Sequence, residues 1–588
     1  MNPHIDVLTL HHDIDRISAW SFHRQSLLIK IALMTAFIGA LYLSPSKTWA
    51  CGGFFCNANN PVNQSAERIL FARDTEAGEI AMHIQIQYEG PPTEFGWILP
   101  TAPGVETSIS SEALFIALDR LYGPVFQLNM NYPDDCLFFD EAAEPNANGG
   151  SLDRGGVQVI SREAIGPYDR AILSAERVED LRAWLDEQQF QIPDELDPKF
   201  QPYIDAGAVF VVIKLLPGND SGDIVPLNLT FPGTRPTIPI IPTSVAATPD
   251  MGIIAHVLDS ARAIPLNYQH VQINEAAIDW ANRGSNYADV VAQAADEAGG
   301  RAFATDFAGS HEGQVTDVLT PYTDAQLEAV AETRTLYDLV DVIPDRTNPD
   351  FQRVAASFIT IPEGVERSDY FRCVRCYDEN GDGDSPVDGA AVAERLRQEI
   401  NPAYESLADV FGRLPYLTRL YTTLSADEME IDPIFSINPD MDDVSNIHVA
   451  EAEVTCDDRG GITVEEITLA DGRTYDAADA TPTQRQEGET VRGADLPAAA
   501  VIEQTFEAGQ PEIVMSMPED MMTPSMDGTA GEDEEMHNGE DNGSETSSGG
   551  DSDDGKDEGC QQGRNMPAPL LLLVLLGGVS VIRRRVLA

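Results

Sequence analysis

The segment Glu79-Ile80-Ala81-Met82-His83-Ile84-Gln85-Ile86-Gln87-Tyr88 decides the fold class, because its apolar and polar side chains alternate. Successive side chains of a β-strand point to opposite faces of the sheet, so the isoleucines, Met82 and Tyr88 share one face. The pattern predicts a strand that is half buried. Residues 68–73 precede it across a turn-like segment, residues 74–78, which predicts an antiparallel pair.

Further strands are predicted in four other segments of the chain. Residues 95–100 read as a third strand of the same sheet, ended by Pro100. Residues 208–216 and 224–231 are nearly continuous apolar runs, which is typical of buried central strands. Residues 462–475 carry a central Asp471-Gly472 pair, the signal of a late β-hairpin.

Helices are predicted where apolar residues recur at helical spacing. These are residues 112–121, a segment from near Ser174 to before Pro193, and a segment from Ser285 to Gly299-Gly300. Thr323-Asp324-Ala325-Gln326 has the form of a capping box. More helix is expected between residues 390 and 423, broken at Pro402 and Pro415. The predicted fold class is α+β, with a mixed, largely antiparallel sheet and packed helices.

The charge of the chain excludes one class of partner. The 588 residues carry a formal charge of −60 and include only 37 lysines and arginines. Nucleic-acid binding requires a surplus of basic residues, so no nucleic-acid partner is expected. Strong acidity instead suits a solvated extracellular surface or one that collects divalent cations.

The amino terminus has the features of an export signal. Arg24 and Lys30 lie at the start of an apolar segment, residues 31–43, and small residues lead to a predicted cleavage after Ala50. Residues 1–50 are therefore interpreted as a signal peptide. The alternative is an uncleaved membrane anchor.

The carboxyl terminus combines an acidic spacer with an apolar run. Residues 516–565 are rich in acid, Gly and Ser and poor in apolar residues, which predicts a disordered linker. Residues 566–588 contain a short apolar run followed by Arg583, Arg584 and Arg585. Arginines flanking a membrane helix stay in the cytoplasm, so the body is predicted outside it, anchored to the membrane at the cell envelope or surface. No protein or envelope partner is identified by these residues.

Seven cysteines follow the predicted cleavage site. Exported chains meet an oxidising environment, so pairing is the expected state. Cys51 with Cys56 and Cys373 with Cys376 are close enough in sequence for local bridges. Because Cys560 lies beyond the acidic linker, Cys136 with Cys456 is the expected long bridge. The Cys373-x-x-Cys376 pair also fits half of a zinc or redox site, but neither a second pair nor a thioredoxin-like context is visible.

Several specific segments lie between the signal peptide and the middle of the chain: Cys51-Gly52-Gly53-Phe54-Phe55-Cys56, residues 63–69, Phe95-Gly96-Trp97-Ile98-Leu99-Pro100, residues 210–214, residues 246–252, and residues 274–287. Together they resemble the bacterial domain of unknown function numbered 2330. The resemblance implies an exported protein but no activity. The predicted domains are an α+β core of this family over residues 51–345 and a helical region with the hairpin over residues 346–515.

In the tail, Gly559-Cys560 precedes the apolar residues 570–582 and the three arginines. This order resembles the sorting signals of myxobacterial-type exported proteins, in which a Gly-Cys pair precedes a short membrane run and an arginine cluster. The resemblance implies that the membrane segment is removed and that Cys560 becomes the attachment point. Residues 566–582 would span only about 25 Å as a helix, which suits a transient anchor.

One local pattern suggests a metal. Oxygen-bearing side chains occupy every second position: Asp378, Asn380, Asp382 and Asp384. With Gly383 at the sixth position, this is the pattern of the first half of a calcium loop. The twelfth position is Gly389 where a bidentate Glu is expected, and Asp388 is the available substitute. The alternative interpretation is an acidic, solvated turn.

No catalytic motif is visible. The chain has no Gly-x-Ser-x-Gly elbow, zinc helix, phosphate loop or dinucleotide fingerprint, and single histidines are more often structural than catalytic. The leading hypothesis is a cell-surface binding or structural component, stabilised by calcium. The rival is a secreted or surface hydrolase whose site is assembled from scattered residues. A pocket that collects a His with an Asp, Glu or Ser would favour the rival.

Overall fold

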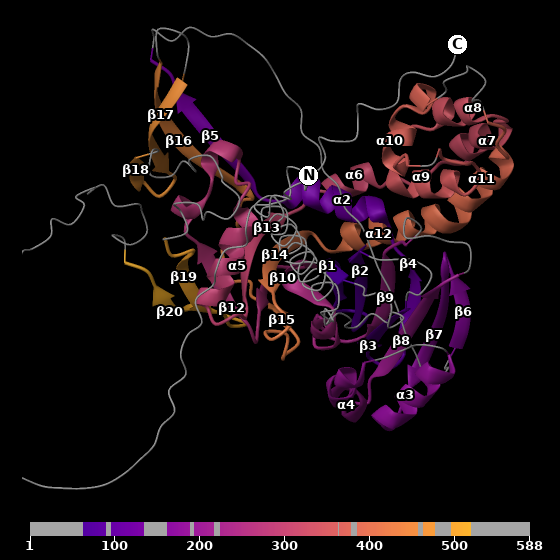
Figure 1. The fold of residues 1–588 in the computed structure, drawn as a ribbon, viewed down its shortest axis with the longest axis horizontal. Helices are drawn as coiled ribbons and strands as arrows, with labels where there is room; N and C mark the ends of the chain where they lie inside the picture. The colour runs from indigo at the N-terminus through magenta and orange to yellow at the C-terminus, as the bar shows by residue number, and fades with distance from the viewer. Residues whose placement is uncertain are drawn as a thin grey trace, which may run out of the picture. The chain divides into compact units, whose positions relative to one another are not determined.

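A ten-stranded sheet organises the part of the chain that the computed structural model describes (Figure 1). The described residues are 63–89, 96–133, 161–188, 193–216, 224–362, 364–377, 385–456, 462–476 and 496–518. In order across the sheet, the strands are β20 (Glu512–Ser516), β19 (Ala499–Gln504), β12 (Gln269–Ile273), β13 (Ala302–Ser310), β14 (Tyr416–Leu424), β10 (Ala247–Asp259), β1 (Asn63–Asp74), β2 (Glu79–Glu89), β9 (Leu227–Pro232) and β4 (Glu106–Ile109).

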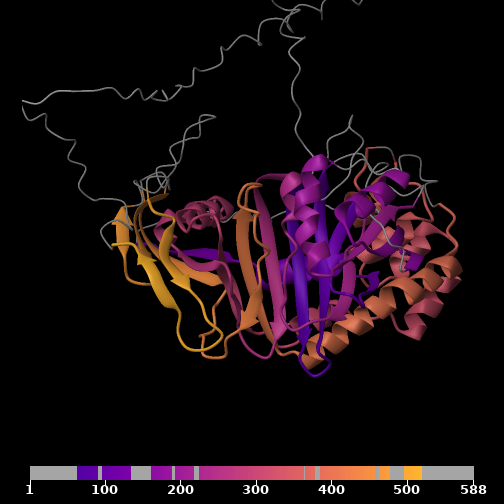
Figure 2. The same ribbon diagram turned by 90° about the horizontal axis from the view of Figure 1, so that it is seen from below.

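The sheet is mixed and mostly antiparallel. Only the pairs β1/β10 and β12/β13 are parallel among its described neighbours. With several packed helices this makes the described chain α+β, so the predicted fold class is confirmed there. Figure 2 shows β19 and β20, in yellow, at one end of the sheet.

The predicted hairpin at the start of the described chain is confirmed. β1 and β2 pair antiparallel, with Ile69 opposite Ile84 and Phe71 opposite Met82. The turn closes where the Gly78 N–H donates to the Asp74 carbonyl at 2.9 Å, and Gly78 has a φ of 72°, which favours glycine. The isoleucines of β2 face the core, as their alternation predicts.

The third predicted strand forms, but in a different sheet. β3 (Gly96–Thr101) pairs with β8 (Val209–Leu215), followed by β7 (Tyr168–Ser174) and β6 (Ser161–Ile165). The expectation that it joins β1 and β2 is wrong, because β10 and β9 already occupy their free edges. Ser174 also ends β7, so the helix expected from this residue begins later, as α3 (Val178–Glu187).

Two hydrophobic cores lie on the two faces of this four-stranded sheet. One lies between it and the ten-stranded sheet, where Phe71 and Ile84 meet Trp97 and Val211. A smaller one lies on the other side of the four-stranded sheet, where Leu173 packs under α3, the 3₁₀ turn η2 (Asp194–Leu196) and α4 (Asp197–Asp205).

A helical layer covers the opposite face of the ten-stranded sheet. Its elements are α2 (Glu112–Tyr122), α6 (Gln314–Val318), α7 (Asp324–Glu332), α8 (Leu336–Val342), α9 (Pro349–Ala356), α10 (Arg367–Arg372), η7 (Val374–Tyr377), α11 (Gly389–Arg395), the π-helical turn Leu396–Ile400 and α12 (Asn401–Arg413). The predicted capping box is present at the start of α7, between Thr323 and Gln326. Leu70, Leu258 and Leu417 meet this layer from the sheet, so both faces of the central strands are buried.

The helix expected up to residue 423 ends earlier. α12 stops at Arg413, Pro415 interrupts the chain, and β14 lies between β13 and β10 in the sheet. The expectation failed because β14 is buried on both faces, which removes the alternation that marks a strand, whereas Thr418, Thr422 and Thr423 favour β structure. Residues 51–345 and 346–515 therefore contribute strands to one sheet.

A further four-stranded sheet contains the predicted late hairpin. Its order is β18 (Thr474–Asp476), β17 (Ile462–Leu469), β16 (Ile447–Cys456) and β5 (Val125–Asn131), and β17 and β18 are antiparallel as expected. It shares a core with α5 (Tyr287–Glu297), η5 (Glu275–Ala277) and η6 (Trp280–Asn282). The short pair β11 (Ala263–Pro265) and β15 (Phe435–Ile437) and the turn η4 (Pro242–Val245) complete the described elements.

No helix within the described ranges is long and apolar enough to cross a membrane. The predicted linker was expected to start at residue 516, but Ser516 is the last residue of β20. The rest of the linker from residue 519, the predicted signal peptide with Ala50, Cys560 and Arg583, Arg584 and Arg585 lie outside these ranges.

Candidate functional site

A small cavity lies where β2, β4 and β9 meet the helical layer. It has a volume of about 160 Å³ and is lined by His83, Ser108, Ser110, Asn228, Glu399 and Ser406, with Ile109, Gln398, Pro402 and Ala403. We call it the His83 pocket. The cavity therefore has room for several water molecules or a small polyol.

His83 forms the floor of the pocket. Its side chain alternates with the isoleucines of β2 and so points toward the helical layer, where it is only 2% exposed. Nδ1 lies 2.7 Å from Oγ of Ser110, while Nε2 has no hydrogen-bond partner within the described chain. Burial lowers the pKa of His83 to about 4, so the imidazole is neutral at pH 7.

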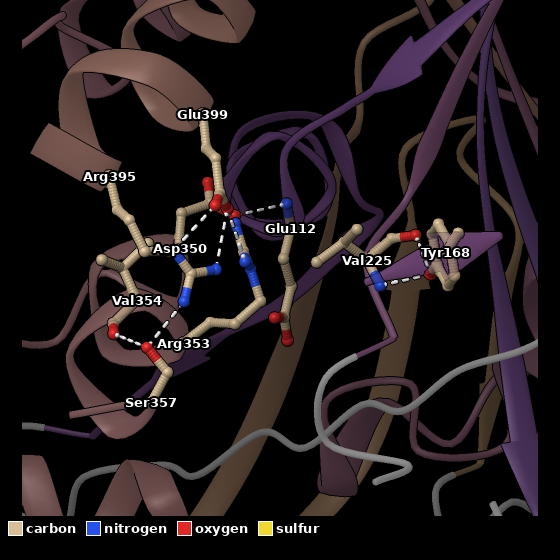
Figure 3. Close-up of polar contacts among 9 residues, drawn as sticks. All are labelled: Glu112, Tyr168, Val225, Asp350, Arg353, Val354, Ser357, Arg395 and Glu399. Atoms are coloured by element: carbon tan, nitrogen blue, oxygen red, sulfur yellow. Dashed lines mark hydrogen bonds and ion pairs between the residues drawn. The ribbon is translucent and has the colours of Figure 1, made fainter. Parts of the chain in front are cut away.

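Ser110 lies in the turn between β4 and α2. Its N–H donates to the Pro226 carbonyl at 2.7 Å. Val225, which precedes Pro226, is held by the hydroxyl of Tyr168, which contacts both its N–H and its carbonyl at 2.6 Å (Figure 3). The backbone on both sides of the pocket is therefore fixed, and the Ser110 hydroxyl faces His83.

Glu399 supplies the carboxylate of the pocket. It lies in the π-helical turn and is held by two arginines, as Figure 3 shows. Arg353 Nη1 is 3.0 Å from Oε2, and Arg395 Nε is 2.7 Å from Oε1. Burial alone would raise the pKa of Glu399, but the hydrogen bond from Arg395 and the charge of Arg353 hold it below its ordinary value. Glu399 is thus ionised at neutral pH. Single π-helical turns inside α-helices often mark functional sites.

Asp350 ties the elements behind the pocket together, and Figure 3 shows its contact with the Glu112 N–H. It is 1% exposed and accepts hydrogen bonds from the Ser111 hydroxyl at 2.6 Å, the Glu112 N–H at 3.0 Å and the Tyr404 hydroxyl at 3.0 Å. Ser111 is also the N-cap of α2, accepting from the Leu114 N–H. One carboxylate therefore fixes α2, α9 and α12 relative to the sheet edge.

Asn228 brings a second buried polar atom to the residues that line the pocket. Asn228 Oδ1 is buried without a partner within the described chain, and its amide nitrogen makes only a 3.4 Å contact with Ser108 Oγ. Buried polar atoms are nearly always paired, by protein or by a bound molecule. The arrangement suits a ligand that carries hydroxyl or N–H groups.

The same pocket contains a serine next to a histidine, the pair that activates a nucleophile in serine hydrolases. Two features weaken this chemistry. A histidine with a pKa of about 4 is a poor general base at neutral pH. Within the described chain, no carboxylate contacts Nε2 to orient the ring.

The residues predicted as a metal site are only partly described. Asp388 is the N-cap of α11 and accepts from the Ala391 N–H at 3.1 Å, while Asp378, Asn380, Asp382 and Asp384 lie outside the described residues. In the described part of the chain, no group of three or more His, Cys, Asp or Glu side chains is placed to hold a metal.

Of the predicted disulfides, the structure contains the bridge between Cys373 and Cys376. Cys51, Cys56 and Cys136 lie outside the described residues, and Cys456 is the last residue of β16.

Sequence reasoning missed the His83 pocket. Its polar residues come from four separate segments, and His83 was assigned only to the polar face of β2. The available signal was weak: the largely apolar segment 224–231 contains a polar residue, Asn228, that lies opposite His83 in the sheet.

A second group of buried charges lies on the same face of the sheet. Arg419 pairs with Asp306 and, at 3.3 Å, with Asp119, which also pairs with Arg68 at 3.2 Å; the Tyr287 hydroxyl donates to Asp306. Arg68 and Tyr287 belong to the sequence segments that carry the family resemblance. These segments thus meet in the structure, at a charge network that joins β1, β13 and β14.

Residues 45–328 match the family model described as "Uncharacterized protein conserved in bacteria (DUF2330)". This match covers a little under half of the chain and confirms the family resemblance over that segment. No curated protein and no solved structure matches the chain. The DUF2330 segment includes His83, Ser110 and Asn228, whereas Glu399 comes from the part of the chain that follows it.

Proposed function

We propose that the protein is an exported, envelope-anchored binding component that holds a small, uncharged polar molecule in the His83 pocket. The observation that supports this function is that two residues lining one cavity, His83 and Asn228, each carry a buried polar atom, Nε2 and Oδ1, without a partner in the described chain. Leaving a buried donor or acceptor unpaired costs free energy, which a ligand with matching groups recovers.

The ligand is uncharged because the pocket is close to neutral. Its carboxylate, Glu399, is already paired with Arg353 and Arg395, and His83 is neutral at pH 7. The side chains of Ser108, Ser406 and Gln398 add hydroxyl and amide groups at the rim. These features fit a small polyol or an amide.

Export and anchorage are supported by sequence. The predicted signal peptide ends at Ala50, and the acidic linker leads to Cys560 and the apolar tail with its three arginines. In this proposal the body lies outside the cytoplasm, the membrane segment is removed, and Cys560 remains as the attachment point. Cell fractionation and mass spectrometry of the mature carboxyl terminus test this: Cys560→Ser releases an anchored protein into the medium, and leaves the location of an unanchored one unchanged.

Ligand binding is tested by thermal unfolding of the full chain against glycerol, erythritol, xylitol, acetamide and urea at low concentration. Binding to the native state raises Tm in a saturable manner. We expect one of these probes to do so, and His83→Phe and Asn228→Leu to abolish the rise. Thr320→Ala, an exposed change outside the pocket, is the matched control. The same shift in all four proteins would contradict the proposal, as would no saturable shift with any probe.

A second candidate function is hydrolysis, favoured by the 2.7 Å contact between His83 and Ser110 in a strand-to-helix turn. A fluorophosphonate reagent distinguishes the two functions because it modifies activated serines covalently. Labelling that is lost in Ser110→Ala and His83→Phe supports a hydrolase. An unlabelled Ser110 together with saturable ligand binding supports the binding function.

A further inference from the structure

A larger cavity lies at the end of α12, apart from the His83 pocket. Its volume is about 310 Å³, and its lining includes Ser310, His311, Glu312, Phe411, Gly412 and Pro415. Ser310 ends β13, the next residues form the turn into α6, and Phe411 and Gly412 belong to the last turn of α12. We call it the Glu312 pocket.

Two positions at this pocket are locally unfavourable. Glu312 has a φ of 51°, in the left-handed region that residues other than glycine rarely adopt. Gly412 lies inside α12, where glycine weakens a helix, yet a Cβ atom built at this position meets nothing within 4 Å. Packing does not require this glycine, and the space beside Gly412, which lines the pocket, is open. Departures from local preference gather at functional sites.

The floor of the pocket is aromatic and carries no charge. The rings of His311 and Phe411 meet edge to face with centroids 5.1 Å apart, and both residues are buried. His311 Nε2 donates to the Leu414 carbonyl at 2.8 Å, and Nδ1 accepts from the Gly313 N–H at 3.0 Å. One donating and one accepting nitrogen describe a neutral imidazole.

The rim carries a negative charge. No basic side chain pairs with Glu312 among the ion pairs of the described residues. Arg413, which follows the pocket-lining Gly412 in the chain, pairs with Asp409 and Asp74. The carboxylate of Glu312 is therefore available to a ligand at the edge of an aromatic cavity.

We propose that the Glu312 pocket binds a small organic ammonium ion. A carboxylate beside an aromatic surface is the combination that recognises such cations, through charge attraction and cation–π contact. The ammonium group lies at Glu312 and the carbon chain enters the cavity over Phe411 and Pro415. This site is independent of the binding function proposed for the His83 pocket, since the two share no lining residue.

The test is calorimetry of the full chain with butylammonium and with 1-butanol, which has the same chain without the charge, in buffer with 0.15 M salt. We expect saturable binding of butylammonium and binding of 1-butanol at least about tenfold weaker. Glu312→Gln should weaken butylammonium binding about tenfold, since it removes the charge and keeps the shape.

Substitutions at Gly412 distinguish binding in the pocket from non-specific binding of cations. Non-specific binding is expected because a chain of charge −60 attracts cations to its whole surface. Gly412→Leu places a side chain in the open mouth and should abolish saturable binding. Gly412→Ala is the matched control and should bind like the wild type while unfolding at a higher temperature. Absence of saturable binding by the wild type overturns the proposal, and so does unchanged binding in Gly412→Leu or in Glu312→Gln.

Discussion

The imidazole of His83 and the hydroxyl of Ser110 lie 2.7 Å apart, one on β2 and the other in the turn that starts α2. The polar face of β2, which its alternation assigns to solvent, is instead covered by the helical layer. His83 and Gln85 are both under 6% exposed there. Polar side chains on a strand face enclosed in this way need hydrogen-bond partners, and among the described residues His83 has one at Nδ1 only.

The first prediction concerns the effect of His83 on the stability of the protein at acid pH. Its folded pKa of about 4 lies below the ordinary value of 6.5, so between these values the unfolded chain binds a proton that the folded chain does not. For this one group, the free energy of unfolding is highest above pH 6.5 and falls by up to about 3 kcal/mol as the pH is lowered toward 4. His83→Gln should unfold in urea with a shallower dependence on pH. His256, whose pKa is also lowered by burial, contributes equally to both proteins and so cancels.

The second prediction concerns Asp432, which should change the pH dependence of stability in the opposite direction. Burial raises the pKa of Asp432 to about 6, although the Tyr203 hydroxyl and the Ile241 N–H donate to it. Between pH 3.8 and 6 the folded chain binds more protons than the unfolded chain, so stability falls as the pH rises through this window. Asp432→Asn should gain stability relative to the wild type as the pH rises from 4 to 7. A constant difference over that range would show that Asp432 ionises normally.

The third prediction concerns Asp350, the shared acceptor behind the His83 pocket. Asp350→Ala removes the acceptor of the Ser111 hydroxyl, the Tyr404 hydroxyl and the Glu112 N–H, which should cost about 3 kcal/mol or more of unfolding free energy. Urea unfolding measures the loss. Glu328→Ala, an exposed change on α7, should stay within about 0.5 kcal/mol of the wild type.

The fourth prediction concerns calcium at residues 378–388. If the proposed loop binds Ca²⁺, the metal raises Tm, EGTA reverses the rise, and Asp382→Ala abolishes it. Asp388→Ala should lower stability by about 1 kcal/mol with or without calcium, because Asp388 caps α11. Calorimetry that detects no heat with Ca²⁺ would remove the metal from the description of this protein.

Local features of the structure follow from the sequence. The β1/β2 hairpin, the late β17/β18 hairpin and the capping box at Thr323 and Gln326 all form as predicted. Each depends on side-chain period or turn chemistry within about a dozen residues, where neighbours along the chain decide the conformation.

The sequence by itself therefore determined the α+β class, these local elements and the DUF2330 resemblance. Only the tertiary structure decided that β14 lies at the centre of the sheet, that β3 joins another sheet, and that His83, Ser110, Asn228 and Glu399 line one pocket. The physical reason is that pairing between distant segments depends on which faces and edges other segments have already covered. A strand buried on both faces loses its alternation, and residues brought together from four segments leave no spacing to recognise.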